Sequence, residues 1–312
     1  MENYTNVILN GNSLELLKTL PDQCVQACIT SPPYWGLRDY DNDAQLGLEE
    51  TPEQYVENMV LLFREVRRVL KDDGTLWLNL GDSYASSTGN IYEISNIKKY
   101  SEGDLNFNRP SRPSSIKQKN LVGIPWRVAF ALQADGWYLR QDIIWHKPNP
   151  MPESVTDRCT KSHEYIFLMT KSAQYYYDHE AIKERSTEST EKRLSQPSLK
   201  NQKGSNRVPN KSNGNMKAVG GDMRNKRSVW TVTTKPYKEA HFAVFPDELI
   251  KPCILAGSAK GDIVLDPFFG SGTTGLVALR SRRRFIGIEL NPDYVAIAEN
   301  RLRPYLKQHE LF

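Results

Sequence analysis

The chain has 312 residues, of which 39% are hydrophobic and 25% are charged, which is the composition of an ordered globular protein with room for a sizeable core. No apolar run approaches the roughly 20 residues that span a bilayer, and the first residues lack the basic start and apolar core of a secretion signal. These features exclude an integral membrane protein and a disordered chain. We expect a cytoplasmic protein without a membrane partner, built from one large or two small domains.

The cysteines give no sign of a metal site or of a disulfide framework. They form no CxxC pair and show no metal-ligand spacing; the four positions are Cys24, Cys28, Cys159 and Cys253. Isolated cysteines of this kind are typical of free thiols, most of them buried. We therefore expect neither disulfides nor a bound metal.

The positive charge of the chain is concentrated in one segment. The formal net charge is only +4, but residues 183–227 contain twelve lysines and arginines against four acidic residues, a local charge of +8. Such a run is typical of a solvated surface or a linker, and also of a segment that contacts nucleic-acid phosphates. Charge alone does not separate these interpretations, so a second signal is needed.

The first 80 residues predict strands that alternate with helices. Residues 6–9 and 25–29 are short apolar runs typical of strands, with a helix predicted between them at 13–20. Residues 52–70 place large apolar side chains at helical spacing, and after a DDG turn residues 75–80 alternate as a strand. This order predicts an α/β fold.

The middle of the chain has two polar stretches with regular structure between them. Residues 83 to about 118 are rich in Ser, Asn, Lys and Pro, which predicts a long mobile loop. A helix is predicted at 125–134, with strands at 138–145 and 163–170. From 183 to 226 the apolar periodicity disappears, which indicates a linker, an insertion or a separate recognition element.

Regular structure resumes near Trp230 and again alternates helices with strands. The predicted elements are a helix at 246–256, a strand at 262–265, a helix at 274–279, a strand at 284–289 and a helix at 293–306. No internal repeat is visible in the chain.

A glycine-rich turn joins the predicted strand at 262–265 to the helix that follows it. Gly270, Gly272 and Gly275 form a GxGxxG pattern, and Glu289 follows about 20 residues later at a strand end. Glycines let the backbone approach a ligand closely, the helix start offers free N–H groups, and a carboxylate there could accept from ribose hydroxyls. A dinucleotide oxidoreductase would look similar, and a turn without any ligand is a further alternative.

Two observations narrow the choice of cofactor. No lysine follows the last glycine of the turn, which disfavours a Walker-type phosphate loop. The turn lies about 45 residues before the carboxyl terminus, whereas a dinucleotide fingerprint usually opens the first βαβ unit. The cofactor turn is therefore preceded by another functional region.

That region contains a proline turn, SPPYW, which follows the strand at 25–29. It should lie at the carboxyl end of the strand, where open α/β sheets bind their ligands. Each proline fixes φ and leaves its carbonyl oxygen as a rigid acceptor. A base extruded from DNA could donate its amino group to the Ser31 hydroxyl and the Pro32 carbonyl, with Tyr34 stacked on its face. Taken alone, the motif could equally be a turn whose aromatic side chains cap the core.

Together, SPPY and the downstream DPFFGSG resemble the amino-methyltransferase family of DNA-modifying enzymes, which act on cytosine N4 or adenine N6. The catalytic motif of that family is a D/N/S-P-P-Y/F turn, and its cofactor motif is an F-x-G-x-G turn, matched here by Phe268, Gly270 and Gly272. The order of the two motifs resembles the circularly permuted β group, in which the target-recognition region lies between them. The resemblance covers residues 3–80 and 230–305.

The resemblance implies a Rossmann-like α/β fold of the S-adenosylmethionine-dependent methyltransferases, with a mostly parallel seven-stranded sheet and helices on both faces. Residues 1–182 would form the catalytic half, with a mobile loop at about 83–118; residues 183–228 a basic insertion for target recognition; and residues 229–312 the cofactor-binding half. Double-stranded DNA is the implied partner. Further basic side chains for it are Lys98, Lys99, Arg109, Arg112, Lys117 and Lys119.

The resemblance also implies the site residues. The catalytic residues would be Ser31, Pro32, Pro33 and Tyr34. S-adenosyl-L-methionine would be bound by Asn12, Phe245, Asp266, Phe268, Gly270, Gly272, Thr273 and Glu289. Asn12 departs from the family pattern, because relatives often carry an aspartate there, and its amide oxygen is a weaker acceptor. No metal is implied.

Three alternatives to an N4-cytosine enzyme stay open. Serine in the first motif position favours cytosine N4, because adenine-N6 enzymes of the permuted group usually carry aspartate there. A cytosine-C5 enzyme would need Cys253 as its nucleophile, but this residue lies inside a predicted helix and no ENV partner is present. A nucleic-acid-binding module with a dead cofactor site is disfavoured by the two intact motifs. We interpret His146 and His163 as structural.

The resemblance leaves the biological setting open. Such enzymes serve in bacterial, archaeal and phage-infected cells, as functional partners of a cognate restriction endonuclease, as orphan housekeeping methylases or as phage-borne protective methylases. Monomer and homodimer are both compatible with the sequence. The recognition sequence depends on contacts to base edges that composition does not fix.

Overall fold

The structure is a computed structural model, and it describes residues 4–36, 45–85, 116–195, 222–234 and 245–309. The chain divides into two compact units, one formed by residues 1–177 together with 228–312 and the other by residues 178–227. Most of the predicted mobile loop at 83–118, including Lys98, Lys99, Arg109 and Arg112, lies outside the described residues. In the part of the chain that is described, no helix combines the length and hydrophobicity needed to cross a bilayer.

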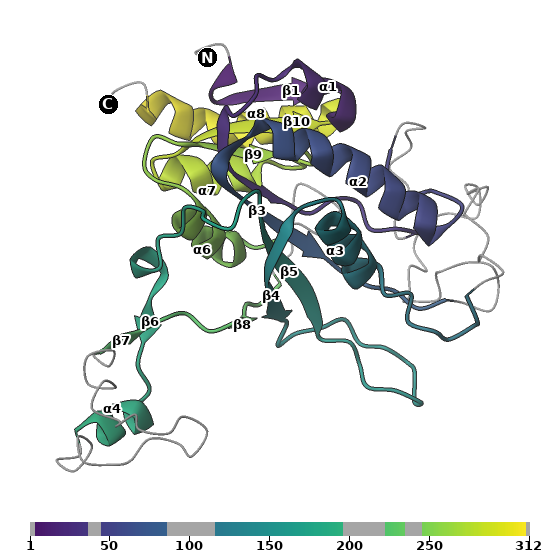
Figure 1. Ribbon diagram of the computed structural model, residues 1–312, viewed down its shortest axis with the longest axis vertical. Coiled ribbons are helices and arrows are strands. Elements are labelled where there is room, and N and C mark those ends of the chain that lie inside the picture. Colours follow the sequence, from purple (N-terminus) through teal and green to yellow (C-terminus); the bar gives the residue numbers. More distant parts are fainter. Residues whose placement is uncertain (1–3, 37–44, 86–115, 196–221, 235–244, 310–312) are drawn as a thin grey trace. The chain divides into compact units, whose positions relative to one another are not determined.

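The larger unit is built on a mostly parallel sheet (Figure 1). Its strands, in spatial order, are β1 (Val7–Asn10), β10 (Arg284–Glu289), β9 (Ile263–Asp266), β2 (Val25–Thr30), β3 (Leu70–Leu80), β5 (His163–Thr170), β4 (Tyr138–His146) and β8 (Val229–Thr231). All neighbours are parallel except that β5 is antiparallel to both β3 and β4. The carboxyl ends of β9, β2 and β3 therefore lie at one edge of the sheet.

The sheet has eight strands among the described residues, so the prediction of seven is corrected. The additional strand, β8, pairs in parallel with the end of β4 through Trp145 and Trp230. The Trp145 indole N–H also donates to the carbonyl of Val232 at 2.8 Å, which fixes the edge strand in register. Three residues are too few to show the period-two alternation by which a strand is predicted.

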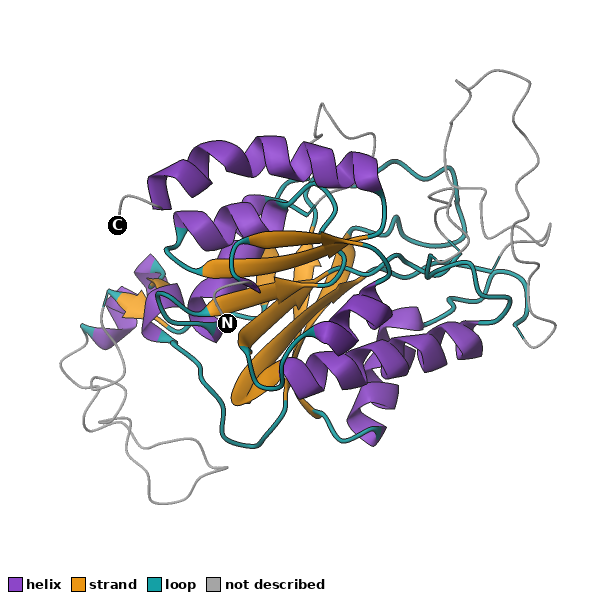
Figure 2. Ribbon diagram, turned by 90° about the horizontal axis from the view of Figure 1, so that it is seen from above, coloured by secondary structure: helices purple, strands orange, loops and turns teal. Residues whose placement is uncertain are grey.

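Helices cover the two faces of the sheet (Figure 2). In the described part of the larger unit they are α1 (Ser13–Thr19), α2 (Pro52–Val69), α3 (Ile124–Ala134), α6 (Asp247–Gly257), α7 (Thr273–Arg280) and α8 (Pro292–His309). The helix α2 contacts α1 and α3, whereas α7 contacts α6 and α8. The helices thus form two groups, one for each half of the permuted chain.

The helix α2 shows how the sequence specifies these elements. Thr51 and Gln54 form a reciprocal capping box at its start, which satisfies free backbone N–H groups. Its apolar side chains recur at helical spacing and are buried: Tyr55, Met59, Leu62, Phe63 and Val66. The strand β3 follows directly, and the predicted DDG turn is a bulge within it, because Val25 pairs with Leu70 and Ala27 with Thr75.

The smaller unit has little regular structure in its described residues. It contains a 3-10 turn at Glu180–Ile182, the helix α4 (Glu188–Leu194) and the antiparallel strands β6 (Glu184–Arg185) and β7 (Met223–Arg224). Arg224 donates to Glu184 at 2.9 Å and ties the two strands together. Residues 196–221, which hold much of the predicted basic insertion, lie outside the described residues.

Candidate active site

The two predicted motifs meet at neighbouring strand ends. The strand β2, which leads into the proline turn, pairs in parallel with β9, which leads into the glycine turn. The Thr30 hydroxyl at the end of β2 donates to the Asp266 carboxylate at the end of β9 over 2.7 Å, across 236 positions of sequence. The proline turn (31–34) and the glycine turn (266–272) therefore lie side by side, at the carboxyl ends of neighbouring parallel strands.

Asp266 organises this junction. One of its oxygens accepts from Thr30 and from the Phe268 backbone N–H, and the other accepts from the Thr274 hydroxyl at 2.6 Å. Burial raises the pKa of the carboxyl to about 7, and the nearby Glu289 adds to the increase, while these hydrogen bonds oppose it. Asp266 thus holds the end of β9, the glycine turn and the start of α7 in one geometry.

The glycine turn presents bare backbone at two positions. Gly270 and Gly272 have φ values of +51° and +80°, in the left-handed region that favours glycine. A Cβ at Gly270 would meet no atom within 4 Å, whereas one at Gly272 would lie 3.0 Å from the Ala298 side chain. Gly270 therefore leaves open space on the turn, and Gly272 permits α8 to approach closely.

Glu289 lies beside this turn at the end of β10. One carboxylate oxygen accepts from the Gly270 N–H at 2.7 Å and the other from the Asn291 N–H at 2.9 Å. Burial raises the pKa of the carboxyl, and these backbone donors counteract part of that increase. The side chain is half-buried and lies beside the glycine turn.

Asn12 caps the helix α1 next to the same turn. Its side-chain oxygen accepts from the N–H groups of Leu14 and Glu15 at 3.0 and 3.2 Å. The adjacent Ser13 hydroxyl donates to the Pro267 carbonyl at 2.5 Å. The start of α1 is thereby fixed against the glycine turn, and the Asn12 oxygen is already used by the helix.

The remaining predicted cofactor residues are Phe268 within the turn, Thr273 at the start of α7, and Phe245 before α6. Phe268 is half-buried and packs against the core, while Thr273, at the start of α7, is buried and accepts from Arg301 at 2.9 Å. Phe245 directly precedes α6 and is partly buried. Residues 235–244, which precede it, lie outside the described residues.

The proline turn is anchored more firmly than its sequence suggests. The Pro33 carbonyl accepts from the Tyr55 hydroxyl at 2.9 Å, so it is used inside the protein, and the prediction that it is left as an acceptor for a substrate is wrong. Pro32 and Trp35 are buried, and the Trp35 indole N–H donates to the Glu49 carbonyl at 2.8 Å. The half-buried Ser31 side chain and the Pro32 carbonyl remain as candidate acceptors for a substrate.

The side chains of the proline turn belong to a hydrogen-bond network. The Tyr34 hydroxyl donates to Glu164 at 2.7 Å and accepts from the Asn79 amide at 2.7 Å. The same amide nitrogen lies 3.0 Å from Glu164 and 3.3 Å from the Ser31 hydroxyl, so its two N–H bonds are shared among three acceptors. Ser31 donates to Tyr34 over 3.4 Å, and Lys147 pairs with the other oxygen of Glu164.

Sequence reasoning missed three members of this network. Asn79 interrupts the apolar end of β3, Glu164 stands near the start of an otherwise apolar β5, and Lys147 follows the end of β4. Burial raises the pKa of the Tyr34 hydroxyl well above its usual value, and the charge of Glu164 adds to this. Tyr34 is therefore a neutral donor at the pH of the cell. A polar residue within an apolar strand was the signal available in the sequence.

Residues weighed as alternative catalysts have structural environments. Cys253 is buried inside α6, and its thiol faces the Leu249 carbonyl of the preceding helical turn. His146 contacts the Thr231 hydroxyl at 3.1 Å, and His163 packs edge-to-face on Tyr165. Among the cysteines, all of which lie in described segments, three are buried and Cys159 is exposed, and none forms a disulfide.

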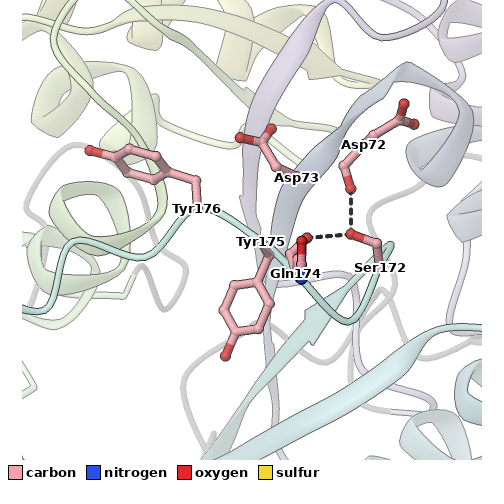
Figure 3. A pocket seen from close by; sticks show the side chains of 6 residues that line it. All are labelled: Asp72, Asp73, Ser172, Gln174, Tyr175 and Tyr176. Carbon is pink, nitrogen blue, oxygen red and sulfur yellow. Dashed lines mark hydrogen bonds between the residues drawn. The ribbon is translucent and has the colours of Figure 1, made fainter.

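A separate pocket lies at the opposite edge of the sheet. It has a volume of about 550 Å³, and Figure 3 shows its lining residues, which are Asp72, Asp73, Ser172, Gln174, Tyr175 and Tyr176. Ser172 donates to the Asp72 carbonyl at 2.8 Å and joins the start of β3 to the residues after β5. Because Asn79 stands near the other end of β3, this pocket is distinct from the proline turn.

Comparison with known proteins establishes the class to which this fold and site belong. The family profile for N6- and N4-type enzymes, described as DNA methylase, matches residues 25–300, and the chain belongs to this family. Among its relatives, the type II methyltransferase M.Cfr9I of Citrobacter freundii is 50% identical over 95% of this chain and 87% of its own length. M.SmaI of Serratia marcescens is 48% identical over 95% of this chain and 90% of its own.

Solved structures confirm the fold class. The cytosine-N4-specific PvuII DNA methyltransferase superposes with a TM-score of 0.62 at 20% identity, over 95% of this chain and 86% of that protein. The Thermus thermophilus protein TTHA0409, solved in complex with S-adenosyl-L-methionine, gives a TM-score of 0.58 at 23% identity, over 96% and 93%. The predicted Rossmann-like methyltransferase fold is thus confirmed, with eight strands in place of seven.

Proposed function

We propose that the protein transfers a methyl group from S-adenosyl-L-methionine to the N4 amino group of a cytosine extruded from duplex DNA. The observation that carries the proposal is the junction between the two turns, fixed by the hydrogen bond from Thr30 to Asp266. This junction places the turn proposed to bind the cofactor next to the turn proposed to bind the amino group. Extrusion is needed because the amino group of a stacked, paired base is out of reach.

The glycine turn fits the cofactor. The open space over Gly270 admits a ligand close to the backbone, and the carboxylate of Glu289 beside it suits the ribose hydroxyls. Asp266, Phe268, Gly272 and Thr273 shape the turn, while Asn12 caps α1, whose Ser13 hydroxyl bonds to Pro267 of the turn. Phe245, at the start of α6, is proposed to enclose the methionine end. S-adenosyl-L-methionine supplies the electrophilic methyl group.

The proline turn orients the nucleophile. The target amino group donates its N–H bonds to the Ser31 hydroxyl and the Pro32 carbonyl, which favours a pyramidal nitrogen with a free lone pair. Pro33 keeps the turn rigid through its bond from Tyr55, and the Tyr34 ring forms a wall of the base pocket. Most of the rate enhancement comes from this positioning. The proton leaves after transfer, so no strong general base is assigned.

The choice of cytosine N4 over adenine N6 is supported by Ser31 in the first position of the motif. One protein with the same fold is named as cytosine-N4-specific, which agrees with this choice. Adenine N6 is the second candidate, because its amino group would donate to the same acceptors. A module that binds DNA without transferring methyl groups is the third.

Double-stranded DNA is the proposed substrate, and residues 183–228 are proposed to recognise the target sequence. The charge of +8 over 183–227 is the observation that supports this role. The relatives named type II methyltransferases suggest a cognate restriction endonuclease as a functional partner. Monomer and homodimer both remain compatible with the proposal.

One experiment separates these candidates. The protein is incubated with isotopically labelled S-adenosyl-L-methionine and unmethylated duplex DNA, and the nucleosides are resolved by mass and chromatography. The proposal predicts labelled N4-methylcytosine. Labelled N6-methyladenine would show that the target is adenine and not cytosine. Labelled 5-methylcytosine would show that the methyl group goes to a ring carbon and would overturn amino methylation. DNA binding without any labelled nucleoside would favour the binding module.

A further inference from the structure

A buried carboxylate contacts Tyr34 of the proline turn together with Asn79 and Lys147. The Glu164 side chain is only 15% exposed, near the start of β5. One oxygen accepts from the Tyr34 hydroxyl and from the Asn79 amide, and the other pairs with Lys147. Lys147 supplies the opposite charge that a buried carboxylate requires.

An ionised carboxylate accepts hydrogen bonds and donates none, so it fixes the direction of the whole chain of hydroxyl groups. The Tyr34 proton must point to Glu164, which leaves the Tyr34 oxygen as an acceptor. The Asn79 amide must likewise turn its NH2 group to Glu164, since the reverse orientation would place two oxygens together. Both constraints pass to Ser31.

Tyr34 and Asn79 together fix the direction in which the Ser31 hydroxyl donates and accepts. Its proton points to the Tyr34 oxygen, and one of its two lone pairs faces the Asn79 amide at 3.3 Å, which shares its two N–H bonds among Ser31, Tyr34 and Glu164. A hydroxyl has one donor and two acceptor positions, so a single lone pair is left for a further partner. The amino group of the target base is a donor, so it can bond to this remaining lone pair of Ser31.

We propose that Glu164, held by Lys147, is a positioning residue that fixes the Ser31 hydroxyl as an acceptor for the target amino group. The inference rests on the proposed function. Glu164 does not touch the substrate; it acts through Tyr34 and Asn79. With glutamine in its place, an NH2 group could donate to Tyr34, Tyr34 could donate to Ser31, and the Ser31 proton would then face the amino group.

The test is a double-mutant cycle on single-turnover methyl transfer, with Glu164→Gln, Tyr34→Phe and the combination. Glu164→Gln should lower the rate by about 10- to 100-fold, the range for hydrogen bonds to charged groups. In the Tyr34→Phe background the same change should cost less, because the Tyr34 hydroxyl is gone and Glu164 can act on Ser31 only through Asn79. Affinity for S-adenosyl-L-methionine, measured by calorimetry, should stay within about twofold in all variants.

Glu65→Gln is the matched control, since Glu65 is a partly buried carboxylate paired with Arg68 at 2.8 Å on α2. It should retain the wild-type rate, and melting temperatures identify any variant that fails to fold. Wild-type rates for Glu164→Gln, or equal losses with and without the Tyr34 hydroxyl, would overturn the inference. If the wild-type protein itself transfers no methyl group, the proposed function fails instead.

Discussion

Replacement of Gly270 by alanine separates ligand binding from backbone strain. Gly270 has φ +51°, and an added Cβ would meet no protein atom within 4 Å. Gly261 offers a matched control, because it has φ +85° and equally open space, but lies before the amino end of β9 with its N–H bonded to Arg282. The two variants carry similar strain at opposite ends of one strand.

The magnitudes follow from these two environments. Alanine in the left-handed region costs about 1–2 kcal/mol, so both variants should lose that much stability. At Gly270 the Cβ also enters the space assigned to the cofactor, and overpacking of this kind costs about 1–3 kcal/mol. Affinity for S-adenosyl-L-methionine should therefore fall about 5- to 150-fold in Gly270→Ala and stay unchanged in Gly261→Ala.

Isothermal titration calorimetry with S-adenosyl-L-methionine measures the affinities, and chemical denaturation measures the stabilities. The expected pattern is two similar losses of stability and a single loss of affinity. Wild-type affinity in Gly270→Ala would show that the cofactor does not pass over this glycine. An equal loss of affinity in Gly261→Ala would show that strain, rather than contact, weakens binding.

Three further predictions concern the junction, the thiol and the DNA. Burial raises the pKa of Asp266 to about 7 from an ordinary value near 4, so the folded state binds the proton more tightly than the unfolded state. Asp266 therefore stabilises the fold at low pH, and up to about 4 kcal/mol of this contribution to the free energy of unfolding is lost as the pH rises from about 4 to 7. The free energy of unfolding across this window should decline less in Asp266→Asn, and identical slopes would refute the assignment. Cys253→Ala should keep wild-type methyl transfer because the thiol is buried in α6, and an inactive but folded variant would point to a cysteine nucleophile. Affinity for duplex DNA should fall steeply as salt rises from about 50 to 200 mM, as counterion release requires, and a flat response would exclude phosphate contact by the basic segment.

The meeting of the two motifs could be predicted from the sequence because parallel strands carry their ends to one edge. SPPY and DPFFGSG each follow an apolar strand, so both turns had to lie at carboxyl ends. The helix at 52–70 was equally clear, since its apolar spacing and its capping residues agree. At these elements the structure predicted from the local sequence pattern is the one that tertiary packing favours.

The network around Glu164 could not be predicted, because it depends on strand pairing between distant segments. Asn79 and Glu164 are 85 positions apart and meet only because β3 pairs with β5 in antiparallel register. Neither residue belongs to a local motif. The inward-turned Pro33 carbonyl has the same origin, since its donor Tyr55 comes from α2. Side-chain partners of this kind follow from tertiary packing and leave little trace in local sequence.

The central claim is that the proline turn and the glycine turn form a single site. A crystal structure of the protein with S-adenosyl-L-homocysteine and a duplex that carries its recognition sequence would test this most directly. We predict the cofactor over Gly270 beside Glu289, with its sulfur facing Ser31, and an extruded cytosine whose amino group lies within hydrogen-bond distance of the Ser31 hydroxyl. A cofactor bound away from the glycine turn, or a target base bound away from the proline turn, would contradict the account.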